Sequence, residues 1–245
     1  MRLRRSRQTF FVNCGRLCLH RISADYIVTF LSIKDKFGDI LNYWYNSYNK
    51  LSDSYNLFFD TAYKSGLYME NKFLNLINAL ESYHRNNINF VSSYIAKEKY
   101  MTDIYPILIK SIPTNLESDF KDALKSKIKF GYEYSLRRRI KELFSYNENF
   151  LNNFICDAEV LKLEIIDSRN YYTHYDEKSI HVVPNIELYG LCEKIIVIFL
   201  SLLLFDLKFN YDEVKSILEN QEKMQRIINV SKKNKEAKNQ RLTNG

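Results

Sequence analysis

The segment SRNYYTH, residues 168–174, holds the side chains of this chain that are best suited to acid–base chemistry. An imidazole such as that of His174 titrates near neutral pH and is the usual acid or base when a protein cleaves RNA without a metal ion. A guanidinium such as that of Arg169 can bind the scissile phosphate and offset the charge of the transition state. Together they would let a ribose 2′-hydroxyl attack the adjacent phosphorus, which leaves a 2′,3′-cyclic phosphate and a 5′-hydroxyl.

The spacing of these residues indicates which catalytic role each of them would take. On an ideal helix Arg169 and His174 lie about 140° apart, whereas Asn170 and His174 stand four residues apart on one face. We therefore expect Asn170 to hold the imidazole tautomer while Arg169 points aside to the phosphate. One chain supplies a single histidine of this motif, so a two-fold dimer that brings two motifs together would complete a cleft.

The same spacing also fits a purely structural interpretation. A chain with four histidines often places an arginine a few residues before one of them by chance, so the motif alone is a weak signal. In this alternative His174 caps a helix and Arg169 pairs with Glu164 or Asp167. Spacing alone leaves both interpretations open.

The scarcity of helix breakers predicts an all-α fold. The chain has 6 glycines and 3 prolines among 245 residues, too few for the turns of a many-stranded sheet. Apolar residues recur at helical spacing in residues 23–44 and near 55–63. The clearest helix covers residues 68–85, where one stripe carries Phe73, Leu76, Ile77, Leu80 and His84, with Glu81 beside it.

Further helices are expected along the rest of the chain. They lie near residues 90–111, 115–129 and 134–146, from about 157 into the 168–174 motif, at about 186–208, and from Asn210 to about Val230. The run of arginines at 137–139 does not form one patch, because consecutive residues of a helix are about 100° apart. At least one of them should face solvent, either solvated or in contact with RNA.

The most apolar stretch, IIVIFLSLLLF at residues 195–205, is flanked by charged residues and is shorter than the about 20 residues that a membrane-spanning helix needs. It predicts a buried core helix that must be covered on every side, by its own domain or by a second copy of the chain. A membrane-associated helical protein is the rival hypothesis. We expect no membrane partner.

The net charge of +7 and the pI near 9.0 fit a partner that carries phosphates, although part of the excess lies in the two ends of the chain. We expect a basic N-terminal stub at residues 1–22, a helical domain at 23–230 and a Lys-rich tail at 231–245. The stub would be a transit peptide or, as we prefer, the remnant of an upstream domain.

The four cysteines are scattered, and only Cys14 and Cys18 are close together. No second pair follows at the spacing of a zinc site, so we expect no metal and no cofactor. The sequence has no signal-peptide pattern either, which predicts a reduced, cytoplasmic protein.

Two segments carry a resemblance to a known family. LNLINALESYHR, followed later by SRNYYTHYD, resembles the HEPN domains at the C-terminus of ApeA-like anti-phage proteins, and the likeness covers roughly residues 25–225. The resemblance implies a helical bundle with extra N-terminal helices that forms a homodimer. It also implies a metal-independent endoribonuclease, acting on tRNA or other cellular RNA as a toxin or anti-phage effector.

The HEPN signature R-N-x-x-x-H assigns roles to individual residues. Arg169 would bind the phosphate, Asn170 would orient, and His174 would act as acid or base. Glu81 and His84 match the other motif and would support them, although Glu81 could simply bridge to an arginine and His84 could be a core residue. ApeA-like proteins carry a large domain before the HEPN part, where this chain has only the stub.

A second hypothesis is a non-catalytic HEPN module that binds nucleotides or RNA, or that regulates a toxin. Such modules often lack the arginine or the histidine of the signature. This sequence has both Arg169 and His174. The sequence therefore favours the ribonuclease, and removing either residue should abolish cleavage without unfolding the chain.

Overall fold

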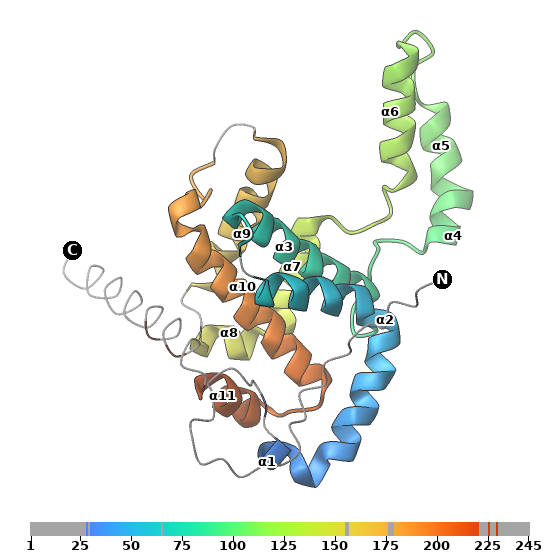
Figure 1. Ribbon diagram of the computed structural model, residues 1–245. Coiled ribbons are helices and arrows are strands. Elements are labelled where there is room, and N and C mark those ends of the chain that lie inside the picture. The colour runs from blue at the N-terminus through green and yellow to red at the C-terminus, as the bar shows by residue number, and fades with distance from the viewer. Residues whose placement is uncertain are drawn as a thin grey trace, which may run out of the picture.

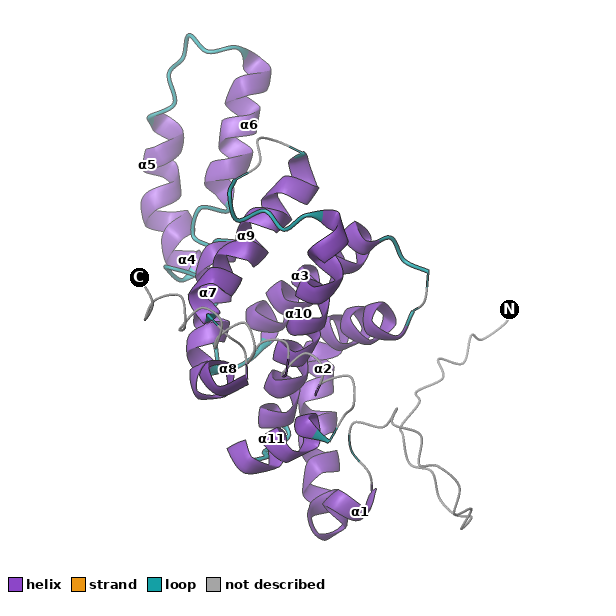
Figure 2. Ribbon diagram, turned by 90° about the vertical axis from the view of Figure 1, so that its left-hand side faces the viewer, coloured by secondary structure: helices purple, strands orange, loops and turns teal. Residues whose placement is uncertain are grey.

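The computed structural model describes residues 28, 30–64, 66–154, 157–175, 179–220, 225 and 229. These residues form helices and connecting loops (Figure 2), and their only β-type pairing is one isolated antiparallel bridge between Ser93 and Glu133. The predicted all-α fold class is confirmed. The stub at residues 1–22 and the tail at 231–245 lie outside the described residues.

The helices follow one another in a simple order. They are α1 (Phe30–Ile33), the 3₁₀ turn η1 (Lys34–Lys36), α2 (Phe37–Tyr63), α3 (Met69–Asn86), α4 (Lys97–Lys99), the π turn η2 (Tyr100–Ile104), α5 (Tyr105–Lys110), α6 (Ser118–Lys129), α7 (Leu136–Tyr146), α8 (Glu148–Phe154), α9 (Ala158–His174), α10 (Asn185–Asp206) and α11 (Tyr211–Glu219).

Helix α10 runs through the middle of the bundle (Figure 1), where every residue from 195 to 204 is buried. Among the described helices it alone is long and apolar enough to cross a membrane, and 78% of its most apolar window is buried inside the fold. Its Phe199 stacks on Phe58 of α2 with ring centroids 4.0 Å apart. The prediction of a core helix is confirmed, and its own chain covers it.

Helix α3 is the second central element, and it packs against α2, α10, α9 and α7. Its predicted stripe, from Phe73 to His84, is completely buried. Ser54 of α2 donates a hydrogen bond to the backbone oxygen of Ala79 (2.8 Å), which satisfies a buried hydroxyl at the crossing of the two helices. This crossing fixes α3 as one wall of the candidate site.

The N-terminal prediction needs a correction, because the two expected segments are one helix. Helix α2 has 27 residues, and the apolar stripe continues through its polar middle with Tyr48, Leu51, Tyr55 and Phe58 at steps of three and four. The predicted start at residue 23 lies in a part of the chain that the structure does not describe.

Helices α4, η2, α5 and α6 form a hairpin that stands off the bundle (Figures 1 and 2). The helix expected from residue 90 begins only at Lys97, because the Asn87 side chain accepts a hydrogen bond from the amide of Asn89 (2.9 Å) in a local turn after α3. Pro106 lacks an amide hydrogen, and the helix widens to a π turn directly before it. Helix α8 was not predicted.

Two helices of the C-terminal half begin close to the residues where they were expected. Asn210 and Glu213 form a capping box at the start of α11, as expected, with bonds of 3.0 and 2.8 Å. Helix α9, expected from about residue 157, begins at Ala158; Leu161 and Ile165 are buried in it, and Val160 is exposed.

Cys192 is the one cysteine within the described residues. It is buried in α10, and burial raises the pKa of its thiol to about 12. Cys14, Cys18 and Cys156 lie outside the part of the chain that the structure describes. Within that part, no three His, Cys, Asp or Glu side chains gather in a group that could hold a metal ion.

Candidate active site

Helix α9 presents the motif because its other face is anchored in the bundle. Leu161, Ile165 and Tyr172 are buried. The Tyr172 hydroxyl donates to the backbone oxygen of Val183 (2.9 Å), and the Val183 amide donates to Oγ of Ser168 (2.9 Å). With these residues facing inward, a helix of 3.6 residues per turn turns Asn170, Thr173 and His174 outward.

His174 is the last residue of α9. The next residue, Tyr175, adopts a left-handed conformation with φ of 54°, and its amide donates to the backbone oxygen of Tyr171 (2.6 Å), which ends the helix. The His174 side chain is exposed and has no hydrogen-bond partner among the described residues. Its imidazole is therefore open to a substrate or to a second chain.

Arg169 is half-buried, and its Nη1 donates a long hydrogen bond to Oδ1 of Asn170 (3.5 Å). Within the described residues it forms no ion pair. The two carboxylates proposed as structural partners are engaged elsewhere: Glu164 lies 4.0 Å from Lys194, and Asp167 lies 3.9 Å from Arg137. The guanidinium thus keeps its charge available for an anion.

The expected contact between Asn170 and His174 is absent from the single chain. Asn170 accepts from Arg169 instead, and no hydrogen bond joins it to the imidazole among the described residues. Asparagine has a short side chain, and the neighbouring guanidinium offers a nearby donor. In this structure Asn170 orients Arg169 rather than His174.

Arg169 and Asn170 line an open cleft of about 500 Å³ between α3, α7, α9 and the neck of the hairpin, that is, residues 92–94 and 130–136 at its base. The cleft is lined by Glu81, Arg85, Phe130, Glu133, Tyr134, Ser135, Leu136, Arg137, Ile166, Arg169 and Asn170. The structure therefore brings three of the predicted residues together, namely Glu81, Arg169 and Asn170. His174 stands outside the cleft at the end of the same helix.

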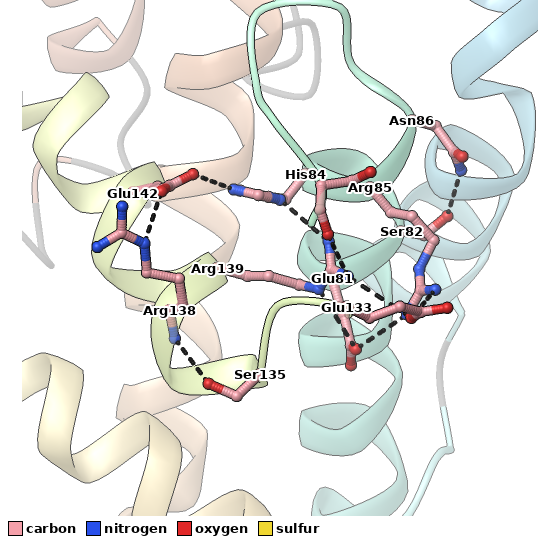
Figure 3. A network of polar contacts seen from close by, with 11 residues as sticks. Glu81, Ser82, His84, Arg85, Asn86, Glu133, Ser135, Arg138, Arg139 and Glu142 are labelled. Carbon is pink, nitrogen blue, oxygen red and sulfur yellow. Dashed lines mark hydrogen bonds and ion pairs between the residues drawn. The ribbon is translucent and has the colours of Figure 1, made fainter. Parts of the chain in front are cut away.

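Glu81 belongs to a network of arginines and carboxylates at the back of the cleft (Figure 3). Arg85 lies 2.6 Å from Glu133 and 3.5 Å from Glu81, and the buried Arg139 lies 3.9 Å from Glu81 and 3.8 Å from Glu133. These pairs neutralise the two carboxylates. Glu81 is thus an arginine partner, the structural alternative that the sequence left open.

His84 is fully buried beside this network and does not line the cleft. Nη1 of Arg139 donates to its Nδ1 (3.2 Å), so its Nε2 carries the hydrogen and donates to Oε2 of Glu142 (2.9 Å; Figure 3). Burial lowers the pKa of His84, and the nearby Arg139 lowers it further. The neutral imidazole is packed on Phe90, with ring centroids 4.7 Å apart, as a core residue would be.

The three consecutive arginines have three different environments, as their helical spacing predicts. Arg137 is exposed at the rim of the cleft, and Arg138 pairs with Glu142 at 2.7 Å. Arg139 is completely buried, which was not predicted. The available signal was the stripe of Arg139, Ile140 and Leu143, which places the arginine on the apolar face of α7.

An all-α bundle that presents an R-N-x-x-x-H motif at the exposed end of one helix is a HEPN-type domain. The family model described as Apea-like HEPN matches residues 74–213, and the chain belongs to this family. The matched residues include both motifs, while α1 and α2 precede them as additional N-terminal helices. Membership points to the kind of function found in RNases and anti-phage effectors. No curated protein and no solved structure matches the chain.

Proposed function

We propose that this chain is a metal-independent endoribonuclease of the cytoplasm that acts as a toxin or anti-phage defence effector. One observation carries the proposal. Helix α9 holds Arg169, which has no carboxylate partner among the described residues, at a cleft, and holds an accessible His174 at its end. The basic charge of the chain favours an RNA partner, tRNA among the candidates.

The chemistry follows from the two side chains. Arg169 binds the non-bridging oxygens of the scissile phosphate and stabilises the charge that grows there. A histidine takes the proton of the 2′-hydroxyl as its oxygen forms a bond to phosphorus. The bond to the 5′-oxygen breaks, and that oxygen leaves with a proton from an acid. The products are a 2′,3′-cyclic phosphate and a 5′-hydroxyl.

A homodimer would supply both the acid and the base. The end of α9 lies beside the starts of α3 and α10: the Tyr172 ring centroid lies 6.1 Å from that of Phe73 in α3, and the Tyr172 hydroxyl donates to the oxygen of Val183 just before α10. Exposed apolar side chains gather at this end of the bundle: Tyr68, Tyr175, Ile180, Ile186 and Tyr189. Burial of this motif-end surface against a second copy would bring two His174 side chains toward one phosphate.

The test is cleavage of total tRNA and of generic single-stranded RNA in EDTA. Wild type should cleave, whereas Arg169→Ala and His174→Ala should lose at least about a hundredfold in rate, the scale of one acid–base or charge-stabilising group. His181→Ala is the matched control, because His181 lies in the loop after α9 and does not line the cleft.

A folded wild type that binds RNA without cleaving it would contradict the nuclease. That result would favour the alternative, a non-catalytic HEPN module that binds RNA or nucleotides or regulates a toxin. The observation that favours this alternative is that His174 lies outside the cleft in the single chain.

A further inference from the structure

The cleft that holds Arg169 also has an aromatic wall. Phe130 lines it and is 55% exposed, whereas seven other phenylalanines of the described residues are buried in the core. Nζ of Lys129 lies 5.7 Å from the ring centroid of Phe130. An exposed aromatic ring beside a cation is an arrangement on which single-stranded nucleic acids stack their bases.

The hairpin neck, residues 92–94 and 130–136, holds Phe130 firmly. The Tyr94 amide donates to the oxygen of Tyr132 (2.8 Å), and the Tyr134 amide donates to the oxygen of Ser92 (3.2 Å). The amide of Gly131 donates to the oxygen of Ile128 (2.9 Å), which closes a turn directly after the ring. A preorganised platform loses little entropy when a ligand binds.

Tyr100 ties this turn to the hairpin. It is buried, and its hydroxyl donates to the oxygen of Ile128 (2.5 Å). A side chain at position 131 would begin only 2.7 Å from the same hydroxyl, so glycine is what allows the close approach. The turn that carries Phe130 therefore keeps a fixed position on the hairpin, and Arg139 of α7 joins the neck to the bundle by its hydrogen bond to the oxygen of Ser92 (3.2 Å).

The charges of the cleft also suit a nucleotide. Glu81 and Glu133 would repel a phosphate, but Arg85 and Arg139 neutralise them. Arg169 has no such partner among the described residues. At about 500 Å³ the cleft falls within the range of about 300–1,000 Å³ that is usual for small-ligand sites.

We propose that the cleft binds one unpaired base of the RNA substrate, stacked on the ring of Phe130, with the adjoining phosphate on Arg169. Phe130 is then a residue that selects single-stranded over duplex RNA, because a base inside a duplex has no free face to offer. The inference rests on the proposed function, because only a ribonuclease makes the phosphate on Arg169 part of a substrate. The stacking site itself can be tested without cleavage.

The experiment uses the full chain carrying His174→Ala, so that RNA is bound but not cut. The probe is a single-stranded RNA that contains 2-aminopurine, whose fluorescence falls when the base stacks. We expect quenching on binding. Adding Phe130→Ala should remove the quenching and raise the Kd about tenfold, the scale of one lost base–aromatic stack. Phe130→Trp should restore both.

Phe120→Ala is the matched control. Phe120 is 53% exposed on the same hairpin but does not line the cleft, so its loss should change neither quenching nor Kd. Equal Kd and quenching in the Phe120→Ala and Phe130→Ala proteins would overturn the proposal, as would a lack of RNA binding. Circular dichroism spectra identical to that of the parent would show that each variant is folded.

A parallel cleavage assay separates this inference from the proposed function. If the wild type does not cleave RNA in EDTA while quenching still depends on Phe130, the proposed nuclease activity is contradicted and the base-binding site is supported. If the wild type cleaves and Phe130→Ala changes neither its KM nor its preference for single strands, the nuclease activity is supported and the base-binding site is contradicted.

Discussion

Arg139 donates a hydrogen bond from Nη1 to Nδ1 of His84 at 3.2 Å, inside the bundle. The same guanidinium donates to the backbone oxygen of Ser92 (3.2 Å), so one buried side chain joins α3, α7 and the neck of the hairpin. These three elements are walls of the cleft. The second motif of the sequence thus contributes to the walls of the site: Glu81 lines the cleft, and His84 is buried behind it.

Replacement of Arg139 by methionine should destabilise the fold strongly. The substitution removes the buried donor to Nδ1 of His84 and to the oxygen of Ser92, and each buried polar group left without its partner costs about 1–3 kcal/mol. Urea unfolding followed by circular dichroism measures the change. Arg137→Met is the control at an exposed position, where we expect a change within about 0.5 kcal/mol. Equal stabilities of the two variants would refute the structural role of Arg139.

His84 should make stability depend on pH. Its folded pKa lies below the ordinary value of 6.5, because burial disfavours the charged imidazole. As the pH falls, His84 is therefore protonated in the unfolded chain before it is protonated in the folded chain. The stability that the neutral imidazole contributes is fully present above pH 6.5, and it is lost as the pH falls from 6.5 toward the folded pKa. The free energy of unfolding, measured by urea titration between about pH 8 and 5, should show this decline in the wild type.

His84→Gln provides the comparison, because glutamine does not titrate. Its free energy of unfolding should be lower at neutral pH but should decline less on acidification. The difference between the two proteins cancels the contributions of all other titrating groups. An unchanged difference across the pH range would show that His84 is not buried as a neutral residue.

Gly131→Ala should strain the neck of the hairpin. Its new Cβ would lie 2.7 Å from the Tyr100 hydroxyl and 3.2 Å from the oxygen of Ile128, and these two atoms are hydrogen-bonded to each other. We expect a loss of about 1–3 kcal/mol, as for overpacking elsewhere, with weaker RNA binding because Phe130 shifts. Thermal unfolding and the quenching assay measure the two effects.

Gly38→Ala is the matched control, since nothing lies within 4 Å of a Cβ at that position in α2. It should be neutral or stabilising by up to about 1 kcal/mol, because glycine disfavours a helix. Loss of stability in both variants alike would contradict the close contact with Tyr100.

Ile186→Glu should separate the proposed dimer. Ile186 is 90% exposed within the motif-end surface, and a charge there opposes burial against a second copy. Sedimentation should show a folded monomer with little cleavage activity. Ile88→Glu, at an 82% exposed position after α3, should leave association and activity unchanged. A fully active monomer would remove the second copy from the mechanism.

The regular parts of the fold could be predicted because their apolar stripes are unambiguous. Phe73, Leu76 and Leu80 define α3, and an apolar run too short for a membrane defines α10 as core. The hairpin could not be predicted as a body that stands off the bundle, because it has almost no buried residues to create a strong pattern; of its residues only Tyr100 is buried.

The site was predictable to the extent that it is local in sequence. Arg169, Asn170 and His174 lie on one helix, so their spacing and outward direction follow from helical geometry. The walls of the cleft come from segments distant in the chain, and Phe130 and Glu133 carry no local signal of their position. The hydrogen bond from Arg169 to Asn170 depends on which donor is nearest in three dimensions, so the predicted bond to His174 was wrong.

The most direct test of the central claim compares two oligonucleotides of one sequence in EDTA, one entirely RNA and one with a 2′-deoxy sugar at the cleaved position. We predict that the wild type cleaves only the first and leaves a 2′,3′-cyclic phosphate and a 5′-hydroxyl, because the 2′-oxygen is the nucleophile. Cleavage of the deoxy-substituted strand, or cleavage of the RNA only after a divalent cation is added, would contradict the account.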